Sequence, residues 1–596
     1  MTDPTSPGEL RERYAAERAK RLRPDGNDQY LQLTGRFEHL LRDPYVERAD
    51  RAPKRDHVTF AFVGGGFAGL VTAARLKEAG VADVRIVEKG GGFGGTWYWN
   101  RYPGAQCDTA AMIYMPLLEE TGHMPSELYA HGPEILEHCD RIGKQYGLHD
   151  DALFHTQVTG LEWDEARSRW IMRTDRGDEF TAQFVGMGTG PLHVPKLPGI
   201  PGIDTFGGHC FHTSRWDYAY TGGDPAGAPM DQLGDKRVAV IGTGATAVQC
   251  VPQLATACRE LLVFQRTPSS VDVRGNRPME PDWFAGVATP GWQSRWMENF
   301  VANMAATEFP AEDLVGDGWT DLAKRIRGRI TAPRSGPAAF AELLADFENA
   351  DFEKMSEIRA RVDQIVTDPA TAQALKAWYR QLCKRPCFHD EYLAAYNLPS
   401  VRLIDTDGRG VERITPAGVV AGGTEYPVDC IIFASGFEVG TSPLRRNGFD
   451  VTGRAGVRLS DYWSAGMRSL HGSHVHGFPN AFLVQLGQNA TFLPNVPHNL
   501  TDAAKTIAAV VAHMNAAGLR VAEPTKEAED AWLDNLAPNP VMTSFLAQCT
   551  PGYYNNEGQD PGPYSVPGGY SRGAAAYFKY IEAWRNSGEF AGLEFR

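Results

Sequence analysis

Residues 57–90 read HVTFAFVGGGFAGLVTAARLKEAGVADVRIVEKG, and this stretch decides the fold class. An apolar run ends in three glycines, an amphipathic segment follows, and a second apolar run closes the unit. The order strand, glycine-rich turn, helix, strand opens a doubly wound parallel sheet. Gly64, Gly66 and Gly69 allow a tight turn and let the backbone approach a pyrophosphate.

The same plan recurs in residues 235–268, DKRVAVIGTGATAVQCVPQLATACRELLVFQRTP. Its turn is formed by Gly242, Gly244 and Ala247. A lone glycine-rich turn is weak evidence, but each of these two follows an apolar strand and opens a helix, which is the confirming context. The sequence therefore predicts an α/β protein with two Rossmann-like dinucleotide-binding domains.

The ribose position distinguishes the two sites. Glu88 follows Gly64 by 24 residues, and Arg266 follows Gly242 by the same 24 residues. An acidic residue there accepts hydrogen bonds from a free ribose 2′-hydroxyl, whereas a basic residue accommodates a 2′-phosphate. We therefore expect FAD in the first site and NADPH in the second, with Thr267 assisting at the phosphate. The alternative is that Arg266 is a solvated residue at a strand end.

The remaining chain suggests six segments. Residues 1–56 form a charged helical extension that begins with a capping box, Ser6 and Glu9. Proline and glycine density at residues 186–202 marks a hinge. The expected segments are the extension (1–56), a first FAD part (57–190), a first NADP part (191–275), a helical insertion (276–383), a second NADP part (384–432) and a second FAD part with a C-terminal active-site loop (433–596).

Composition narrows the class of protein. The 596 residues are 42% hydrophobic and 22% charged, with a net charge of −14, which argues against nucleic acid and anionic membranes as partners. The N-terminus lacks an apolar signal-peptide core, and no apolar run reaches membrane-spanning length. Nine cysteines suggest mostly reduced thiols. We expect a cytoplasmic enzyme, monomeric or dimeric, without a metal.

Two dinucleotide sites imply hydride transfer from a nicotinamide to a flavin. A disulfide reductase would need a cysteine pair facing the flavin. Cys107 has no near partner in the sequence, and Cys383 and Cys387 make a weak candidate pair. Reaction of the reduced flavin with dioxygen is then the leading hypothesis.

Two further stretches resemble the motifs of type I Baeyer–Villiger monooxygenases. One is GGTWYWNRYPGAQCD, residues 94–108. The other lies in FGGHCFHTSRWD and is made of Phe206, Gly208, His212, Trp216 and Asp217. With the two turns in this order, the resemblance extends over about residues 57–596.

The resemblance implies a reaction and its residues. In this family NADPH reduces FAD, dioxygen adds to give a C4a-peroxyflavin, and this species attacks a ketone to yield an ester or lactone. Arg385, in CKRPCFHDEYL, resembles the family's catalytic arginine, and Asp108 would pair with it. An arginine suits a developing oxyanion because it stays charged. The alternatives are a turn residue for Asp108 and an ordinary surface residue for Arg385.

Binding residues follow from the turns and the resemblance together. For FAD we expect Gly64, Gly66, Phe67, Ala68, Gly69, Glu88, Lys89, Gly95, Thr96, Trp97, Tyr102 and Asp108. For NADP we expect Gly242, Thr243, Gly244, Ala245, Thr246, Ala247, Arg266, Thr267, Lys384 and Arg385.

By resemblance, His212 lies beside the interdomain linker and positions the NADP domain, with Phe206 and Trp216 packing the hinge. A zinc site of His209, Cys210 and His212 is the alternative, but it lacks a clear fourth ligand. The stretch CTPGYYNNEGQ, residues 549–559, resembles the mobile loop that covers the nicotinamide and substrate. It carries Tyr553 and Tyr554, where smaller members often have a tryptophan. An ordinary surface loop is the alternative.

The extension and this loop resemble the subgroup that takes bulky ketones, namely macrocyclic, steroid and pentalenolactone-type terpenoid substrates. Two other functions remain open. One is a flavin monooxygenase that oxidises nitrogen or sulfur, and the other is a redox sensor that binds FAD and NADPH without turnover.

Overall fold

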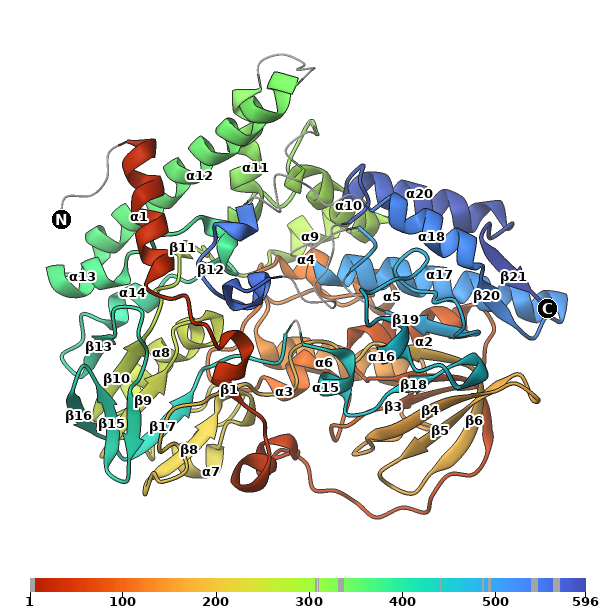
Figure 1. Cartoon of the computed structure of the whole chain (residues 1–596), viewed down its shortest axis with the longest axis horizontal. Helices are drawn as coiled ribbons and strands as arrows, with labels where there is room; N and C mark the ends of the chain where they lie inside the picture. Colours follow the sequence, from red (N-terminus) through yellow and green to blue (C-terminus); the bar gives the residue numbers. More distant parts are fainter. Residues whose placement is uncertain are drawn as a thin grey trace.

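A computed structural model places two sheets side by side beneath a layer of helices, with the chain termini at opposite ends (Figure 1). It describes residues 6–305, 308, 310–330, 337–439, 441–484, 487–490, 495–536, 545–560 and 569–596, and for residues 337–340 the backbone alone. Within these residues, every helix is too short or too polar to cross a membrane.

The first sheet has seven strands, in the order β18-β4-β5-β6-β2-β3, with β19 added beside β6. β2, β3, β6 and β19 run parallel, whereas β4 and β5 form an antiparallel hairpin that joins β6. The strands are β2 (His57–Val63), β3 (Val84–Val87), β4 (Val158–Asp164), β5 (Arg169–Thr174), β6 (Glu179–Met187), β18 (Val451–Thr452) and β19 (Ala481–Leu483).

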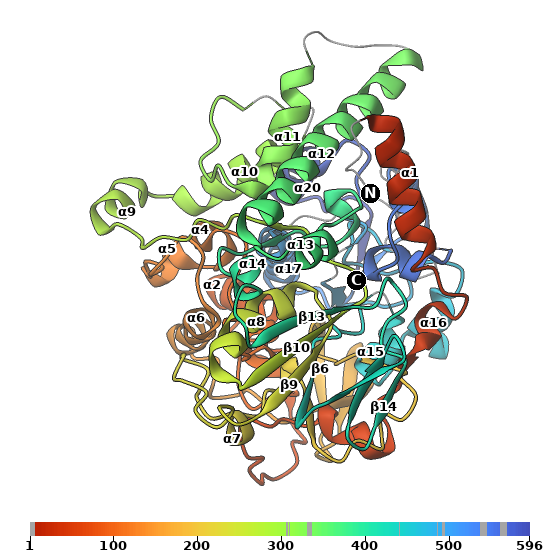
Figure 2. The same ribbon diagram turned by 90° about the vertical axis from the view of Figure 1, so that its left-hand side faces the viewer.

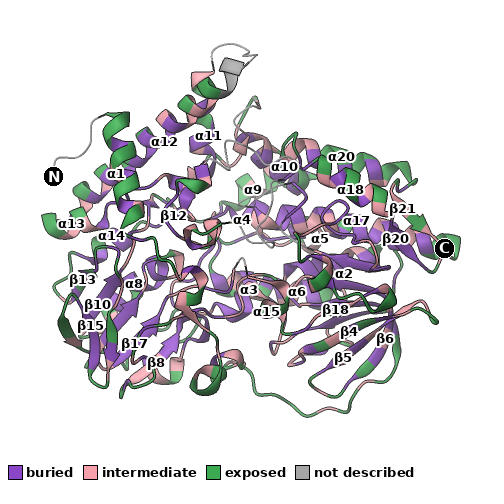
Figure 3. Cartoon of the chain, in the orientation of Figure 1, coloured by how far each residue is buried: buried purple, intermediate pink, exposed green. Residues whose placement is uncertain are grey.

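Two helices pack together over this sheet, α2 (Phe67–Glu78) and α17 (Val496–Ala517). Phe60, Phe184 and Phe482 stack between sheet and helices and are almost wholly buried. Burial of such aromatic side chains supplies about 2–3 kcal/mol each. The core therefore lies where the apolar runs of the sequence placed it (Figure 3). The sheet itself is mixed and not purely parallel, because the β4–β5 hairpin joins it in the antiparallel direction.

The second sheet is wholly parallel, in the order β13-β10-β9-β17-β8. Helix α8 (Ala245–Ala257) covers one face, and a three-stranded antiparallel sheet packs on the other. The five parallel strands are β8 (His209–His212), β9 (Arg237–Ile241), β10 (Glu260–Gln265), β13 (Val401–Asp405) and β17 (Cys430–Phe433). The antiparallel strands are β14 (Arg413–Thr415), β15 (Gly418–Ala421) and β16 (Thr424–Pro427).

Both turns need glycine for a physical reason. Gly64 has φ +109°, and a Cβ there would lie 2.6 Å from the carbonyl oxygen of Gly188. Gly242 has φ +113°, and a Cβ there would overlap the carbonyl oxygen of Ala434. Side chains other than hydrogen are excluded, so each turn stays tight and each helix starts close to its strand.

Helices dominate the chain between β11 (Val271–Asp272) and β12 (Cys387–Phe388). They are α9 (Pro281–Val287), α10 (Trp292–Met304), α11 (Gly318–Arg329), α12 (Pro337–Ile365) and α13 (Pro369–Leu375). Helices α12 and α13 rise above the second sheet (Figure 2), whereas α10 packs into the core of the first domain.

The N-terminal extension is only partly helical. Helix α1 (Pro7–Ala19) begins with the expected capping box, because Ser6 and Glu9 exchange hydrogen bonds. The extension then continues through a 3₁₀ turn, η1 (Gly26–Gln29), into β1 (Tyr30–Leu31), which pairs with β7 (Leu197–Pro198). The sequence did not suggest this strand, since two residues carry no periodicity. It fastens the extension to the hinge segment.

Candidate active site between the two nucleotide-binding domains

A cavity of about 2330 Å³ opens between the two sheets. One wall carries Thr96, Trp97 and Tyr102 of the first domain, and the opposite wall carries the turn at Gly242 and Gly244. Arg385 and the C-terminal loop with Tyr553 and Tyr554 also line it. The walls therefore combine segments from both ends and the middle of the chain.

Asp108 is the centre of an ion-pair network on this cavity. Its Oδ2 atom lies 2.6 Å from Nη1 of Arg385, and its Oδ1 atom pairs with Nη2 of Arg274. The Asp108 side chain is 2% exposed, that of Arg274 is 4% exposed, and that of Arg385 is 34% exposed. The Asp108 backbone oxygen also accepts a hydrogen bond from the indole of Trp319, at 2.7 Å. One buried carboxylate thus holds two guanidinium groups, of which Arg385 alone reaches substantially into the cavity.

The carboxylate of Asp108 stabilises the positive charge on Arg385. Burial by itself would lower the pKa of the Arg385 guanidinium, but the carboxylate of Asp108 raises it well above its ordinary value. The group therefore stays cationic at every pH at which the protein is folded.

The first turn fits a pyrophosphate and ribose. Helix α2 begins at Gly66 with no side chain capping its N-terminus, so its first N–H groups are available to an anion. Glu88 follows β3, and its carboxylate accepts hydrogen bonds from the N–H groups of Gly65 and Gly90, both at 2.6 Å. Burial raises the pKa of Glu88, although those two N–H groups oppose the shift. The carboxylate therefore lies directly beside the turn, as a ribose acceptor should.

The other residues expected at FAD surround this turn. Phe67, Ala68 and Gly69 are buried in the first turn of α2, and Lys89 is half-buried after Glu88. Gly95 precedes the short helix α3 (Thr96–Trp99). Tyr102 instead reaches the second domain, where its hydroxyl donates to Oε1 of Gln249 on α8, at 2.8 Å.

The second turn has the same open helix end. Gly244 starts α8 without a side-chain cap, followed by Ala245, Thr246 and Ala247. Thr243 donates to the backbone oxygen of Thr267, at 2.7 Å. Arg266 follows β10 and lines the cavity, with its Nη1 donating to Oε1 of Gln29 at 2.6 Å.

Lys384 stands beside Arg266 on the cavity wall. Burial, helped by the charge of Arg266, lowers the pKa of Lys384 to about 8. Two cations at this place fit a dianionic 2′-phosphate, which would favour the charged form of Lys384.

Comparison with known proteins shows the family. Residues 63–128 match the model of the NAD(P)-binding Rossmann-like domain. A Baeyer-Villiger monooxygenase of Streptomyces coelicolor is 51% identical over 97% of this chain and 95% of its own length. The neopentalenolactone D synthase of Streptomyces avermitilis is 48% identical over 98% of this chain and 99% of its own.

The chain belongs to the type I Baeyer–Villiger monooxygenases. Among solved structures, the polycyclic ketone monooxygenase of Thermothelomyces thermophila has a TM-score of 0.92 at 39% identity and covers 99% of both chains. A complex of OTEMO with FAD and NADP has a TM-score of 0.73 at 28% identity, over 90% of this chain and 99% of that one.

The family's His212 motif lies outside the cavity walls, beside the two linkers that join the domains, residues 186–202 and the residues that follow β17. His212 ends β8, accepts a hydrogen bond from the N–H of Ser214, and packs edge-on against Phe437 at 5.7 Å. Phe437 in turn bridges to Pro195, so the two linkers meet here. Burial lowers the pKa of His212 to about 3, and the ring is neutral.

The rest of this motif packs within the second domain. Phe206 and Trp216 are buried in its core, on opposite faces of its parallel sheet, and a Cβ at Gly208 would collide with the Phe206 ring. Asp217 caps a short helix, α7 (Tyr218–Thr221), and pairs with His209 at 2.9 Å. In the part of the chain that the structure describes, no three His, Cys, Asp or Glu side chains gather as a metal site would require.

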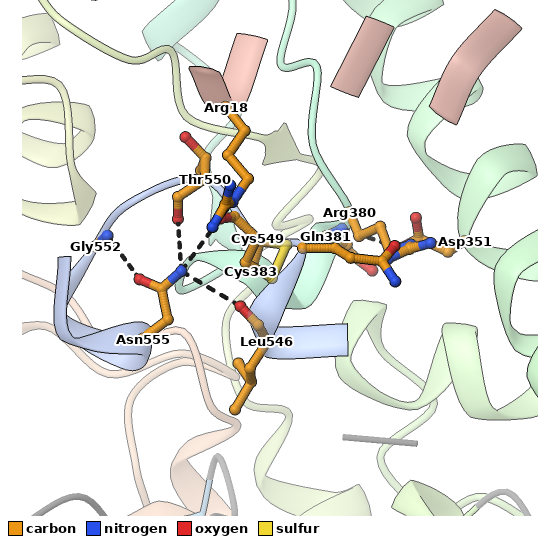
Figure 4. Close-up of a disulfide and its surroundings, with 11 residues drawn as sticks. Arg18, Asp351, Arg380, Gln381, Cys383, Leu546, Cys549, Thr550, Gly552 and Asn555 are labelled. Atoms are coloured by element: carbon orange, nitrogen blue, oxygen red, sulfur yellow. Dashed lines mark hydrogen bonds between the residues drawn. A yellow bond between two sulfur atoms is a disulfide. The ribbon is translucent and has the colours of Figure 1, made fainter. Parts of the chain in front are cut away.

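A disulfide ties the C-terminal loop to the Arg385 segment. Cys383 pairs with Cys549, whereas Cys387 is a buried free thiol (Figure 4). The candidate pairing of Cys383 with Cys387 is therefore wrong, and of the nine cysteines the other seven are free. Asn555 braces the same loop, accepting from the N–H of Gly552 at 3.0 Å and donating to the carbonyl of Cys549 at 3.2 Å.

Several residues of this family member escaped the sequence reasoning. Arg274 is the second partner of Asp108, and Gln249 joins the two domains by hydrogen bonds to Tyr102 and the Gln106 backbone. Gln29 contacts Arg266 from the extension. None of them is part of a motif's fixed pattern, and the partner of each lies more than 140 residues away in the sequence. No local signal could have found them.

Arg274→Met should destabilise the enzyme, because the buried Asp108 carboxylate would lose one of its two counter-charges. We expect a cost of about 2–4 kcal/mol, seen as a fall of several degrees in the thermal unfolding midpoint. Arg277→Met is the matched control, since Arg277 is exposed three residues away. Equal midpoints for the two variants would contradict the prediction.

Cys549→Ser should free the C-terminal loop while leaving the two domains folded. The bond closes a loop with a sequence separation of 166 residues, for which a stabilisation of roughly 2–4 kcal/mol is typical. We expect faster chymotryptic cleavage after Tyr553 or Tyr554 and a lower unfolding midpoint. Cys258→Ser, which removes a free half-buried thiol, should change neither.

Proposed function

We propose that this chain uses FAD, NADPH and dioxygen to convert a bulky polycyclic ketone into an ester or lactone. The observation that carries the proposal is the Asp108–Arg385 pair, which sets a fixed cation on a cavity bordered by the NADP-type turn. The relatives' names, Baeyer-Villiger monooxygenase and neopentalenolactone D synthase, agree with ketone oxygenation.

We assign FAD to residues 57–190 and 433–596, and NADP to residues 191–275 and 384–432. The open helix ends at Gly66 and Gly244 suit the two pyrophosphates, and Glu88 suits the FAD ribose. Arg266, Thr267 and Lys384 would hold the NADP 2′-phosphate. When bound, these cofactors supply the electrons and the activation of dioxygen, and in OTEMO both are present together.

The protein's own contribution centres on Arg385. Its guanidinium would lie beside the ketone carbonyl and stabilise the negative charge that develops on the carbonyl oxygen. Asp108 orients it by holding Nη1, and Arg274 holds Asp108 from the other side. Asp108 and Arg274 are thus positioning residues.

Exclusion of water is the second contribution. Trp97, Tyr114 and Trp319 give the cavity an aromatic lining near Asp108, and Tyr553 and Tyr554 approach from the loop. A dry site strengthens the interaction of Arg385 with the oxyanion. It also keeps activated oxygen from being lost as hydrogen peroxide.

The bulky substrate class is part of the proposal. The cavity of about 2330 Å³ would hold the nicotinamide end of the cofactor together with the ketone. The structural neighbour with a TM-score of 0.92 is named for polycyclic ketones. The extension and loop that distinguish the bulky-ketone subgroup are both built into the cavity wall.

The test is product analysis by mass spectrometry with NADPH, air and a panel of ketones, and with one thioether. We expect a fused-ring terpenoid or steroid ketone to gain one oxygen atom as an ester or lactone, ahead of cyclohexanone. Arg385→Ala should still allow flavin reduction by NADPH in stopped flow, but it should lower ester formation by about 100-fold or more.

Arg385→Lys is the control that keeps the charge but loses the forked geometry of the guanidinium. Its rate of ester formation should lie between those of the wild type and Arg385→Ala. Persistent ketone oxygenation in Arg385→Ala would refute the role of Arg385. Oxidation of the thioether alone would point to a heteroatom monooxygenase instead.

Binding of NADP⁺ should weaken as the pH rises through about 8. The pKa of Lys384 is lowered to about 8, so below that pH the ammonium is charged and attracts the phosphate, and above it the attraction is lost. Calorimetric titrations from pH 7 to 9.5 should show up to a tenfold rise in Kd per pH unit above 8. Lys384→Arg should abolish this dependence, and an unchanged pH profile in that variant would contradict the assignment.

A further inference from the structure

The C-terminal loop carries a buried carboxylate that the reaction does not use. Glu557 lies in η6 (Tyr553–Gly558), and its side chain is 5% exposed. Asn556 and Glu557 both have positive φ, +51° and +55°, a conformation that costs non-glycine residues energy. This backbone conformation directs the Glu557 carboxylate into the protein.

Glu557 points at the cations of the expected 2′-phosphate site. Its Oε2 atom lies 3.6 Å from Nη2 of Arg266, and its Oε1 accepts a hydrogen bond from the hydroxyl of Tyr30 at 3.2 Å. The charge of Glu557 also opposes the lowering of the pKa of Lys384 and Lys196 by burial. The Glu557 carboxylate thus lies near three basic side chains, those of Arg266, Lys384 and Lys196.

The N-terminal extension holds the loop in this position. Asn27 donates from Nδ2 to Oδ1 of Asn556 at 2.6 Å, and Gln559 donates to the backbone oxygen of Arg23 at 2.8 Å. At the other end, the Cys383–Cys549 disulfide anchors the base of the loop. The tip carrying Glu557 is therefore held to the extension by hydrogen bonds and not by a covalent bond.

A 2′-phosphate and this carboxylate cannot share the same cations without repulsion. A phosphate monoester carries close to two negative charges and a carboxylate carries one, and like charges at this separation in a partly buried site repel strongly. One of the two must leave. The phosphate is the stronger ligand for Arg266 and Lys384 because it brings more charge and more acceptor oxygens.

We propose that Glu557 occupies the 2′-phosphate subsite as a displaceable latch, so that the phosphate of NADP(H) expels it and releases the loop tip from the extension. This rests on the proposed placing of the NADP 2′-phosphate at Arg266. The coupling is reciprocal: a latched loop weakens nucleotide binding to the same extent that the nucleotide unlatches the loop. Tyr553 and Tyr554 share η6 with Glu557. Binding of the 2′-phosphate therefore also changes how these two tyrosines lie over Arg385.

The test uses 2′,5′-ADP, which has the 2′-phosphate but no nicotinamide, and 5′-AMP, which lacks the phosphate, in calorimetric titrations of the FAD-loaded enzyme. Glu557→Gln keeps an acceptor for Tyr30 but removes the charge. It should bind 2′,5′-ADP about tenfold more tightly than the wild type and bind 5′-AMP equally. Asp560→Asn removes an exposed carboxylate from the same loop and should change neither affinity.

A second measurement follows the loop itself. Hydrogen exchange of residues 552–560 in the wild type should accelerate when 2′,5′-ADP is added and stay unchanged with 5′-AMP. In Glu557→Gln, exchange should be fast already without nucleotide.

Arg266→Ala separates this inference from the assignment beneath it. If Arg266→Ala loses its preference for 2′,5′-ADP over 5′-AMP while Glu557→Gln binds like the wild type, the latch is refuted and the NADP site stands. If Arg266→Ala keeps the wild-type preference, the 2′-phosphate binds elsewhere, and both the assignment of the NADP site and the latch are refuted. Weaker binding of 2′,5′-ADP by Glu557→Gln would make Glu557 part of the nucleotide site and would also overturn the latch.

Discussion

The carboxylate of Asp108, buried between Arg274 and Arg385, is the interaction on which the rest of the site depends. A carboxylate removed from water is costly unless cations and hydrogen bonds replace its hydration. Asp108 belongs to the first domain, whereas its two partners flank the helical segment and belong to the chain of the second. The charge can be satisfied in this position only when the two domains meet, so the network fixes where the active site can form.

Other contacts between the two domains also hold them together around Asp108. Gln249 of α8 bonds to Tyr102 and to the backbone of Gln106, which brings the second nucleotide turn against the first domain. Trp319 of α11 (Gly318–Arg329) donates to the backbone of Asp108, so the helical segment also reaches the network. Arg385 is thus positioned by parts of the chain that form neither nucleotide turn.

The two ends of the chain meet over the cavity that this boundary creates. The extension pairs with the hinge segment through β1 and β7, and it bonds to the C-terminal loop through Asn27 and Gln559. The disulfide joins that loop to the residue two positions before Arg385. Arg266, Lys384, the C-terminal loop and the segment with Arg385 therefore line one continuous cavity.

The sequence by itself determined the strand–turn–helix–strand unit that begins each nucleotide-binding domain, its glycine turn, and the family. These depend on local patterns, because strand, turn and helix are encoded by neighbouring residues, and motifs have fixed spacing. The ribose roles of Glu88 and Arg266 stay predictions. The pairing of Asp108 with Arg385 followed from the family resemblance, and the structure shows it at 2.6 Å. Tertiary structure alone decided the second partner Arg274, the pairing of Cys383 with Cys549, the strand β1 and the inward turn of Glu557. In each of these the partners are more than 160 residues apart, and only the packing of the folded chain brings them together.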